Sequence, residues 1–321
     1  MEQVIIYGIG ATGKKLLECL KYRNEESIIK CFCDIRSDAI TNLEGYAVIA
    51  PAEAIGTGIP IVVAVENKEF KEEIRSFLEK EHAKYFESIE AWYRSQGKDF
   101  IEWDRDLVAA YHVRDMDFYF KDAERKEVMN LFWGGDSDFL RMFKFLNLEN
   151  VVELACGRGR QVPYYIDNAG HAILVDILQE NINICKKRFH VYHNITYYKN
   201  NGYDLSEISD NSCSSIFSYD SLVHFEMMDI FSYLKESYRI LRKGSYALFH
   251  HSNNHGDYRI SFAHGSGKHG RNYMSRDLFA YLSYRAGFEI IEQKVMDFGG
   301  VKELDCITLL QKPMNERSWN W

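Results

Sequence analysis

The chain has 321 residues, of which 46% are hydrophobic and 14% aromatic, and its formal net charge is -8 at pH 7. This length predicts two domains, each with its own hydrophobic core. The negative charge disfavours nucleic acid and acidic membrane surfaces as partners, and no stretch approaches the roughly 18 apolar residues that a membrane span needs.

Seven cysteines are scattered through the chain without a C-x-x-C pair. This odd, dispersed set argues against a disulfide framework or a zinc knuckle. The chain also enters a strand-like run within its first residues, which leaves no room for a signal peptide. We therefore predict free thiols, no bound metal and a cytoplasmic protein, and we leave a homo-oligomer open.

Residues 1–85 alternate between strand-like runs and helical patterns. The strand-like runs lie at residues 4–6, 28–33, 46–49 and 59–65. A charged amphipathic helix follows, with Phe70, Ile74 and Phe77 on one stripe. The alternation predicts a small Rossmann-like domain with a parallel sheet of four strands.

A glycine loop in this segment fits the dinucleotide-binding pattern. Gly8, Gly10 and Gly13 follow the first strand, and Asp34 stands roughly 20 residues later, at the end of the second. The later run Gly45-Tyr46-Ala47-Val48-Ile49-Ala50-Pro51 resembles the small Rossmann-like domains attached to bacterial sugar-modifying enzymes, where nucleotide-linked sugars bind. Three interpretations stay open: a nucleotide-sugar domain, a dinucleotide domain, and a structural or dimerising domain.

Residues 86–148 carry no strand signal but are rich in charged and aromatic side chains. So many aromatic rings need burial, which disfavours a disordered linker. We predict a helical connector and cap between two domains.

A second β/α series occupies residues 149–321. Its strand-like runs lie at residues 151–155, 171–175, 195–199, 214–219, 245–250, 287–294 and 304–311. An apolar helical stripe covers residues 227–241, and Gly244 is placed to end that helix. The series predicts a seven-stranded α/β domain.

The strongest motif is Glu153-Leu154-Ala155-Cys156-Gly157-Arg158-Gly159, a buried strand followed by a glycine turn. Glycines let the backbone approach a ligand without a Cβ clash, and a helix beginning after Gly159 would turn free N–H groups toward an anion. The next strand ends in Asp176, whose carboxylate can accept both hydroxyls of a ribose. Such groups at the carboxyl ends of parallel strands would hold a nucleoside.

The series resembles the class I S-adenosylmethionine-dependent methyltransferases. Its motif matches their first motif, E/D-x-G-x-G-x-G, apart from Ala155, and Asp176 matches the acidic end of their second strand. Asn201 follows the third strand, where the family contacts adenine, and Tyr219 lies in the fourth-strand region beside the methyl group. The resemblance covers about residues 110–312 and implies S-adenosylmethionine as cofactor. The residues that it assigns to the cofactor are Glu153, Ala155, Gly157, Gly159, Asp176, Asn201 and Tyr219.

The resemblance completes the fold prediction, an α/β protein with two Rossmann-like domains. A small N-terminal parallel sheet and a larger seven-stranded methyltransferase sheet are joined by a helical segment. Two residues depart from the family pattern. Ala155 replaces a glycine, which costs little unless its φ is positive. Arg158 stands where a small residue is common, and contact with the donor carboxylate and simple solvation both stay open.

Methyl transfer from a sulfonium is an in-line displacement, so the protein mainly aligns the acceptor and excludes water. An alcohol acceptor also loses a proton, most often to a histidine or a carboxylate. Asp220 and His224 follow the fourth strand, whereas His250 and His251 end the fifth. Because side chains alternate along a strand, only one of that pair faces the site, and we choose His251. The predicted catalytic residues are His224, His251 and Asp220, with a structural helix-start histidine as the alternative for His224.

Five histidines lie between His250 and His269, among several glycines, and this predicts an acceptor loop. A solvated loop without a role and a metal site formed by His251, His255 and Asp257 are its alternatives. The favoured function is O-methylation of a small polar acceptor, a sugar or a nucleotide-linked sugar, with N-methylation left open. The competing functions are an NAD(P)-dependent oxidoreductase or redox sensor, and a non-catalytic S-adenosylmethionine-binding protein. The chain lacks a basic patch interleaved with aromatic residues, which also disfavours nucleic acid.

Overall fold

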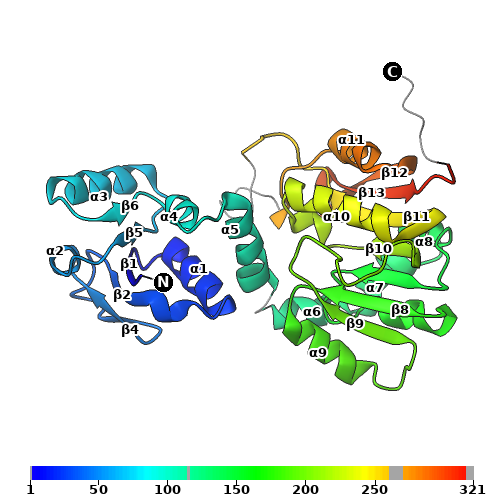
Figure 1. The fold of residues 1–321 in the computed structure, drawn as a ribbon, viewed down its shortest axis with the longest axis horizontal. Helices are drawn as coiled ribbons and strands as arrows, with labels where there is room; N and C mark the ends of the chain where they lie inside the picture. Colours follow the sequence, from blue (N-terminus) through cyan, green and yellow to red (C-terminus); the bar gives the residue numbers. More distant parts are fainter. Residues whose placement is uncertain (1, 114–115, 260–269, 316–321) are drawn as a thin grey trace. The chain divides into compact units, whose positions relative to one another are not determined.

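The computed structural model describes residues 2–113, 116–259 and 270–315, and it divides the chain into two compact units. The first unit is Met1–Asp115 and the second is Met116–Trp321 (Figure 1). The segment 86–148, expected to connect two domains, is thus shared between the two units. Most of the predicted acceptor loop, residues 260–269, lies outside the described residues.

The first unit holds a six-stranded sheet in the order β3-β4-β2-β1-β5-β6. Its strands are β1 (Val4–Tyr7), β2 (Ile29–Cys33), β3 (Asn42–Leu43), β4 (Tyr46–Ile49), β5 (Ile61–Val63) and β6 (Tyr85–Phe86). The four predicted strands are present and parallel. The two added strands are very short: β6 is parallel to β5, and β3 forms an antiparallel hairpin with β4. Two-residue strands give little period-2 signal, which is why the sequence did not predict them.

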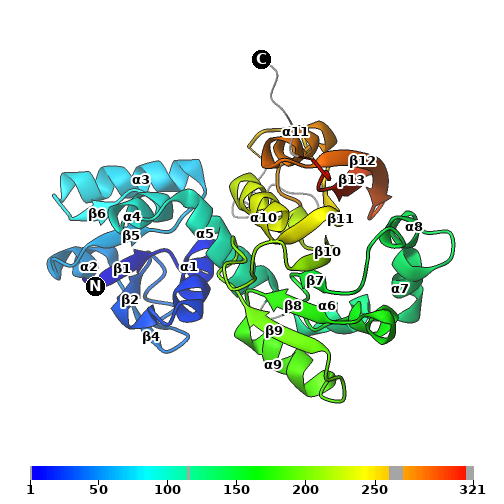
Figure 2. The same cartoon turned by 45° about the vertical axis from the view of Figure 1, so that its right-hand side comes forward.

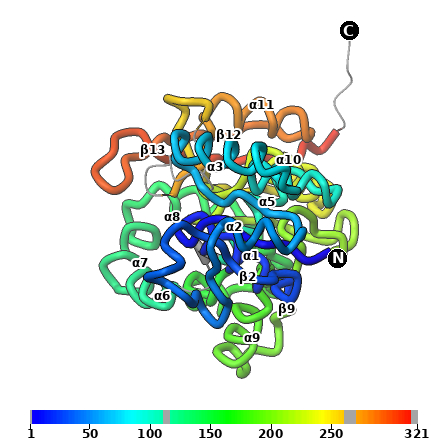
Figure 3. Tube along the Cα trace, turned by 90° about the vertical axis from the view of Figure 1, so that its left-hand side faces the viewer, coloured from blue at the N-terminus to red at the C-terminus, as the bar shows by residue number. Residues whose placement is uncertain are grey.

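Helices surround this first sheet, and Figure 3 follows them from the blue α1 and α2 to the cyan α3. They are α1 (Ala11–Tyr22), η1 (Glu26–Ile28), α2 (Pro51–Gly56), α3 (Lys68–Lys80), α4 (Ile89–Ser95), α5 (Phe100–Leu107) and the π-helix η2 (Val108–Val113). Aromatic residues predicted to need burial are buried here, among them Trp92 and Trp103. A buried carboxylate, Asp106, accepts hydrogen bonds from Arg23 at 2.7 Å and Tyr93 at 3.1 Å, which joins α5 to α1 and α4.

The second unit holds the predicted seven-stranded sheet, in the order β12-β13-β11-β10-β7-β8-β9. Its strands are β7 (Val151–Leu154), β8 (Ala172–Asp176), β9 (Ile195–Lys199), β10 (Cys213–Ser218), β11 (Leu241–Ser252), β12 (Glu289–Phe298) and β13 (Val301–Gln311). The strands from β9 to β11 are parallel, and β13 is antiparallel to both of its neighbours. The chain order reverses at β7, so the carboxyl ends of β7, β8 and β10 meet at a topological switch point.

Both faces of this sheet are covered, which explains its continuous apolar strands. Helices α7, α8 and α9 pack on one face, whereas α10 and α11 pack on the other (Figures 1 and 2). The helices of this unit are α6 (Asp117–Ala123), α7 (Lys126–Trp133), α8 (Asp138–Phe143), η3 (Val162–Tyr164), η4 (Ile166–Asn168), α9 (Gln179–Arg188), η5 (Leu222–His224), α10 (Met227–Ile240) and α11 (Arg276–Ala286).

The end of α10 differs from the sequence prediction. The helix stops at Ile240, and Gly244 lies inside β11 with a φ of 80°. A buried lysine satisfies the last carbonyl groups instead: Nζ of Lys312 donates to the oxygens of Tyr238 and Leu241, both at 2.7 Å. This contact is made by a residue distant in sequence, so no local glycine signal was needed.

Within the described part of the chain, no helix is both long and apolar enough to cross a membrane.

Candidate functional site

The loop after β7 has an unusual backbone. Ala155, Gly157 and Gly159 have φ values of 55°, 55° and 76°, in the left-handed region. A Cβ at Gly159 would lie 2.4 Å from Cε2 of Phe189, so only glycine fits there. Ala155 carries a side chain in a conformation that costs an L-residue about 1–2 kcal/mol. We expected replacement of glycine by Ala155 to cost little stability only if its φ were negative. The φ of 55° shows that it is positive.

The residues after Gly159 form the short 3₁₀ helices η3 and η4 rather than the predicted α-helix. Pro163 and Gly170 lie in this segment, and both residue types disfavour a continuous α-helix. The loop therefore lacks a long helix dipole, and arginines flank its last glycine instead. The Arg158 side chain pairs with Asp117 and lies over the ring of Phe120, 4.4 Å from its centre. Of the two interpretations of Arg158, neither describes this pairing.

Asp176 ends β8 directly beside the glycine loop. Its Oδ2 accepts the N–H of Gly157 at 2.8 Å, and its Oδ1 accepts the N–H of Leu178 and the amide of Asn181. Burial raises the pKa of this carboxyl group. A carboxylate offers about four lone-pair positions, so three bonds leave room for one further donor. Asp176 could accept hydrogen bonds from both ribose hydroxyls, as predicted, only if one of its three present hydrogen bonds broke.

Glu153, at the centre of β7, lies beneath the loop. Its Oε2 accepts the hydroxyl of Tyr165 at 2.7 Å, and burial raises the pKa of its carboxyl group to about 8. This carboxyl group is therefore largely protonated near pH 7. Because the Glu153 carboxyl group bonds to the buried Tyr165, its contact favours a structural role in positioning the loop.

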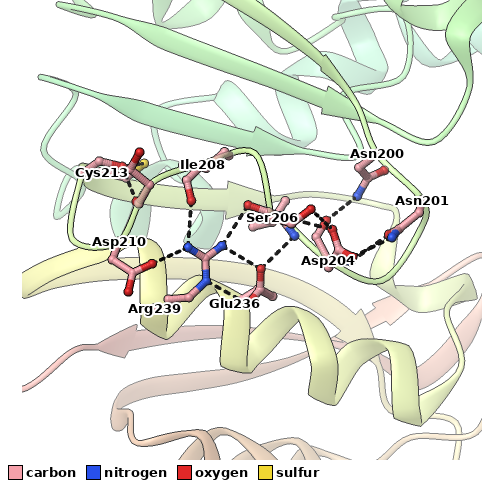
Figure 4. Close-up of polar contacts among 12 residues, drawn as sticks. Asn200, Asn201, Asp204, Ser206, Ile208, Asp210, Cys213, Glu236 and Arg239 are labelled. Carbon is pink, nitrogen blue, oxygen red and sulfur yellow. Dashed lines mark hydrogen bonds and ion pairs between the residues drawn. The ribbon is translucent and has the colours of Figure 1, made fainter.

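The loop after β9 contains Asn201, the residue assigned to adenine. Its Oδ1 accepts the N–H groups of Tyr203 and Asp204, and its Nδ2 donates to the Asp204 carboxylate at 2.6 Å (Figure 4). Arg239 of α10 then fixes the following residues through the carbonyl oxygens of Leu205 and Ile208 (Figure 4). Asn201 thus shapes its own turn, and it stays exposed at the sheet edge.

A buried group of ionisable residues lies at the ends of β10 and β11. We call it the edge cluster, and it consists of Tyr119, Arg160, Asp220, His250, Arg271 and Asp305. Oδ2 of Asp220 accepts the Tyr119 hydroxyl at 2.7 Å and the Arg160 guanidinium at 2.9 Å. Burial alone would raise the pKa of Asp220, but Arg160 and Tyr119 hold it well below its usual value. The Asp220 carboxyl group is therefore ionised near pH 7 and pairs with Arg160.

The second half of the edge cluster is an ion pair. It joins Arg271, in the segment before α11, to Asp305 of β13. Arg271 donates to both carboxylate oxygens of Asp305, at 3.0 and 2.6 Å, and both side chains are almost fully buried. Nδ1 of His250 accepts the N–H of Asp220 at 3.0 Å, so the proton of the neutral ring is on Nε2, 3.2 Å from Asp305. Tyr219 stacks on His250 with ring centres 4.4 Å apart, which places it beside the cluster as well.

The structure separates the two histidines that end β11. His251 lies in the core on the α11 face, stacked on Phe279 at 3.7 Å, and its ring nitrogens contact Ser252 and Thr308. Burial lowers its pKa to about 3. The choice of His251 over His250 is corrected here, because β11 turns His250, and not His251, toward the edge cluster.

His224 lies in η5, close to the edge cluster. Its Nδ1 is 2.7 Å from the carbonyl oxygen of Gly270, and burial lowers its pKa to about 4. Since a carbonyl oxygen only accepts, Nδ1 carries the proton and Nε2 is the basic nitrogen. Asn272 donates to the carbonyl oxygen of His224 at 2.7 Å, so the segment after the predicted acceptor loop is tied to η5.

Sequence reasoning missed Tyr119, Arg160 and Asp305 as site residues. A signal existed for two of them: Arg160 directly follows the glycine motif, and Asp305 interrupts an apolar run in β13. Tyr119 comes from α6, which also covers the loop: a Cβ at Gly157 would lie 3.1 Å from Cε1 of Phe120. Among the described residues, no group of three potential ligands could hold a metal ion.

Comparison with known proteins identifies a match within the second unit. Residues 152–249 match a family model described as a methyltransferase domain. No curated protein matches the chain. The matched part of the second unit is therefore a domain similar to methyltransferases.

Several solved structures are similar to the chain at low identity. A methyltransferase from Aquifex aeolicus is 14% identical, with 61% of this chain and 97% of that chain covered and a TM-score of 0.46. One from Methanosarcina mazei is 15% identical, with 55% and 98% covered and a TM-score of 0.45. A geranyl diphosphate C-methyltransferase from Streptomyces coelicolor, in complex with S-adenosyl-L-homocysteine, is 11% identical, with 54% and 74% covered and a TM-score of 0.45.

S-adenosylmethionine is the cofactor of this domain. The residues present fit such a group. Gly157 and Gly159 hold a left-handed backbone that no Cβ crowds, and the neighbouring Asp176 keeps one acceptor position for a donor of the bound group. When bound, the cofactor supplies a methyl group already activated on a sulfonium.

Proposed function

We propose that the second unit transfers this methyl group to an oxygen of a small polar acceptor, a sugar or a nucleotide-linked sugar. The observation that carries the proposal is the edge cluster. It gathers the carboxylates of Asp220 and Asp305 and the guanidinium groups of Arg160 and Arg271 beside the glycine loop. Hydroxyl groups bond to both kinds of side chain, and the four charges balance. A sugar group rich in hydroxyls, free or linked to a nucleotide, suits such a site.

We assign the acceptor's proton to His224. The acceptor oxygen forms a bond to the methyl carbon as the carbon–sulfur bond breaks, and the oxygen releases one proton. A pKa of about 4 keeps His224 neutral near pH 7, the state in which an imidazole ring can accept a proton. Asp220 has the different role of holding Tyr119 and Arg160 in position.

The test is a methyl-transfer assay on the full chain with labelled S-adenosylmethionine and a panel of sugars and nucleotide-linked sugars. We expect labelled product from at least one sugar, and we expect His224→Gln to lower kcat at least tenfold with unchanged affinity for S-adenosyl-L-homocysteine. His190→Gln, a matched change at an exposed histidine of the same unit, should leave kcat unchanged. Donor binding without turnover on the whole panel would contradict the proposed acceptor class, and a fully active His224→Gln would contradict the proton assignment.

A further inference from the structure

The first unit contains a large cavity that methyl transfer does not use. It has a volume of about 880 Å³ and opens at the carboxyl ends of β1, β2, β4 and β5. Strands β2 and β5 lie on opposite sides of β1, so this is the switch point of the first sheet. Cavities that hold cofactor-sized ligands have volumes of roughly 300–1,000 Å³ and lie at such points.

The three glycines of the loop after β1 differ in whether the surrounding protein leaves room for a Cβ atom. A Cβ at Gly13 would lie 2.0 Å from the carbonyl oxygen of Gly8, and one at Gly8 would lie 2.8 Å from that of Ala64. Close packing of strand and helix accounts for both. Gly10 has an ordinary φ of -77°, and a Cβ there would meet no protein atom within 4 Å. Protein packing therefore gives no reason for this glycine, and the space above it belongs to the cavity.

Polar groups from the loop after β1 and the end of β2 line part of this cavity. Helix α1 begins at Ala11, and no side chain caps its first turn, so backbone N–H groups there are available to an anion. Asp34, at the end of β2, accepts the N–H of Ile9 at 3.2 Å. Burial alone would raise the pKa of Asp34, but hydrogen bonds from Arg36 and the backbone hold it below its usual value, so it is ionised. The Arg36 side chain is 54% exposed and can turn away into solvent.

The rest of the lining is mostly apolar. Ile35 and Phe70 border the cavity and are 79% and 58% exposed, which is unusual for such large side chains. Ile74 and Phe77 of α3 continue this surface. A flat, weakly polar ring could be covered by these side chains on one side.

From this arrangement we propose that the first unit binds a ribonucleoside 5′-diphosphate ester. The diphosphate lies over Gly10 at the start of α1, Asp34 accepts the ribose hydroxyls, and the base packs against Ile35 and Phe70. Asp34 requires free hydroxyls, because its negative charge repels a phosphate placed on the ribose. A dinucleotide and a nucleotide-linked sugar share this chemistry, and the proposal is independent of methyl transfer in the second unit.

The test is calorimetric titration of the full chain with NAD⁺, UDP-glucose and NADP⁺. Saturating S-adenosyl-L-homocysteine is present throughout, so that the donor site of the second unit cannot take the nucleotide. We expect NAD⁺ or UDP-glucose to bind, and the preferred one identifies the source of the diphosphate. NADP⁺ should bind at least tenfold more weakly than the preferred ligand. Gly10→Val and Asp34→Asn should each weaken binding at least tenfold.

The matched control is Gly56→Val. Gly56 ends α2, does not line the cavity, and also has open space where a Cβ would lie. This variant should bind the nucleotide normally, and thermal unfolding followed by circular dichroism should show that all variants fold. Failure of both NAD⁺ and UDP-glucose to bind the wild-type chain would overturn the proposal. Unchanged binding by folded Gly10→Val would do the same, and NADP⁺ binding as tight as that of NAD⁺ would overturn the role of Asp34.

Discussion

The two units share one structural arrangement, a glycine loop bonded to an aspartate, on different sheets. In each, a central strand leads into a glycine loop, and the neighbouring strand ends in an aspartate that accepts an N–H from that loop. Asp34 accepts from Ile9 at 3.2 Å, and Asp176 accepts from Gly157 at 2.8 Å. The carboxylate therefore joins two adjacent strand ends in both units, whatever ligand each one takes.

The two aspartates differ in their surroundings. Asp34 pairs with the exposed Arg36 and borders an open cavity, whereas Asp176 is buried against the amide of Asn181. The second loop is covered by Phe120 of α6. In both units the sheet topology therefore places an aspartate at the end of the strand beside the glycine loop. The segments packed around that aspartate determine how exposed it is to solvent.

The largest expected effect concerns buried and exposed ion pairs. Arg271→Met should lower the free energy of unfolding of the second unit by about 3–5 kcal/mol, because it removes the guanidinium group that pairs with the buried Asp305. Arg36→Met should cost the first unit less than about 1 kcal/mol, because Arg36 is largely exposed and Asp34 keeps the hydrogen bonds that it accepts from backbone N–H groups. Urea unfolding of both variants measures the difference. Equal losses would break the comparison.

The next effect concerns the donor site. Asp176→Ala should weaken binding of S-adenosyl-L-homocysteine by about 1.5–3 kcal/mol, the value of a hydrogen bond to a charged group. Calorimetric titration measures this loss, and the Asp34→Asn variant is the control in the other unit. If Asp34→Asn weakened this binding equally, the two loops would not act as separate sites.

A smaller effect is expected in acid. The pKa values of His224 and His251 fall from 6.5 to about 4 and about 3 in the folded state, so the unfolded chain binds more protons below pH 6.5. Stability is therefore lost as pH falls from 6.5 toward 4, by up to about 1.4 kcal/mol per pH unit for each histidine.

Urea unfolding across this pH range should show that His251→Gln has a flatter loss than the wild type. Glu153 acts in the opposite direction, because its raised pKa makes stability fall as pH rises from 4.5 to about 8. It is present in both proteins, so their difference isolates the histidine. Parallel pH profiles would contradict the buried, neutral state of His251.

The smallest effect sharpens the comparison of the loops. The first loop has glycine at its left-handed position, Gly8 with a φ of 117°, whereas the second begins with Ala155 at 55°. Ala155→Gly should raise the free energy of unfolding by about 0.5–1 kcal/mol, because relief of the strain exceeds the entropy that glycine loses. Ala169→Gly, at a φ of -89°, should instead be destabilising. A loss of stability in both variants would contradict the strain.

Local pattern was sufficient for much of the fold. The seven strands of the second sheet and the acid that ends β8 follow from apolar runs and their polar ends. The bond between Arg271 and Asp305 could not be predicted, because it depends on how β13 pairs with β11 and not on spacing. The choice between His250 and His251 failed for a related reason: alternation says that they face opposite sides, but only the packing of Phe279 in α11 shows that His251 is the one enclosed by apolar side chains.

Lys312 offers a consequence for chemical labelling. Its ammonium group is buried among carbonyl oxygens at the end of α10, with a third bond to Asn211 at 2.9 Å. An amine-reactive reagent reaches it only when β13 separates from that helix, whereas exposed lysines react at once. The rate at which Lys312 is modified, read by mass spectrometry, would thus report the opening of one edge of the second sheet while the rest of the chain stays folded.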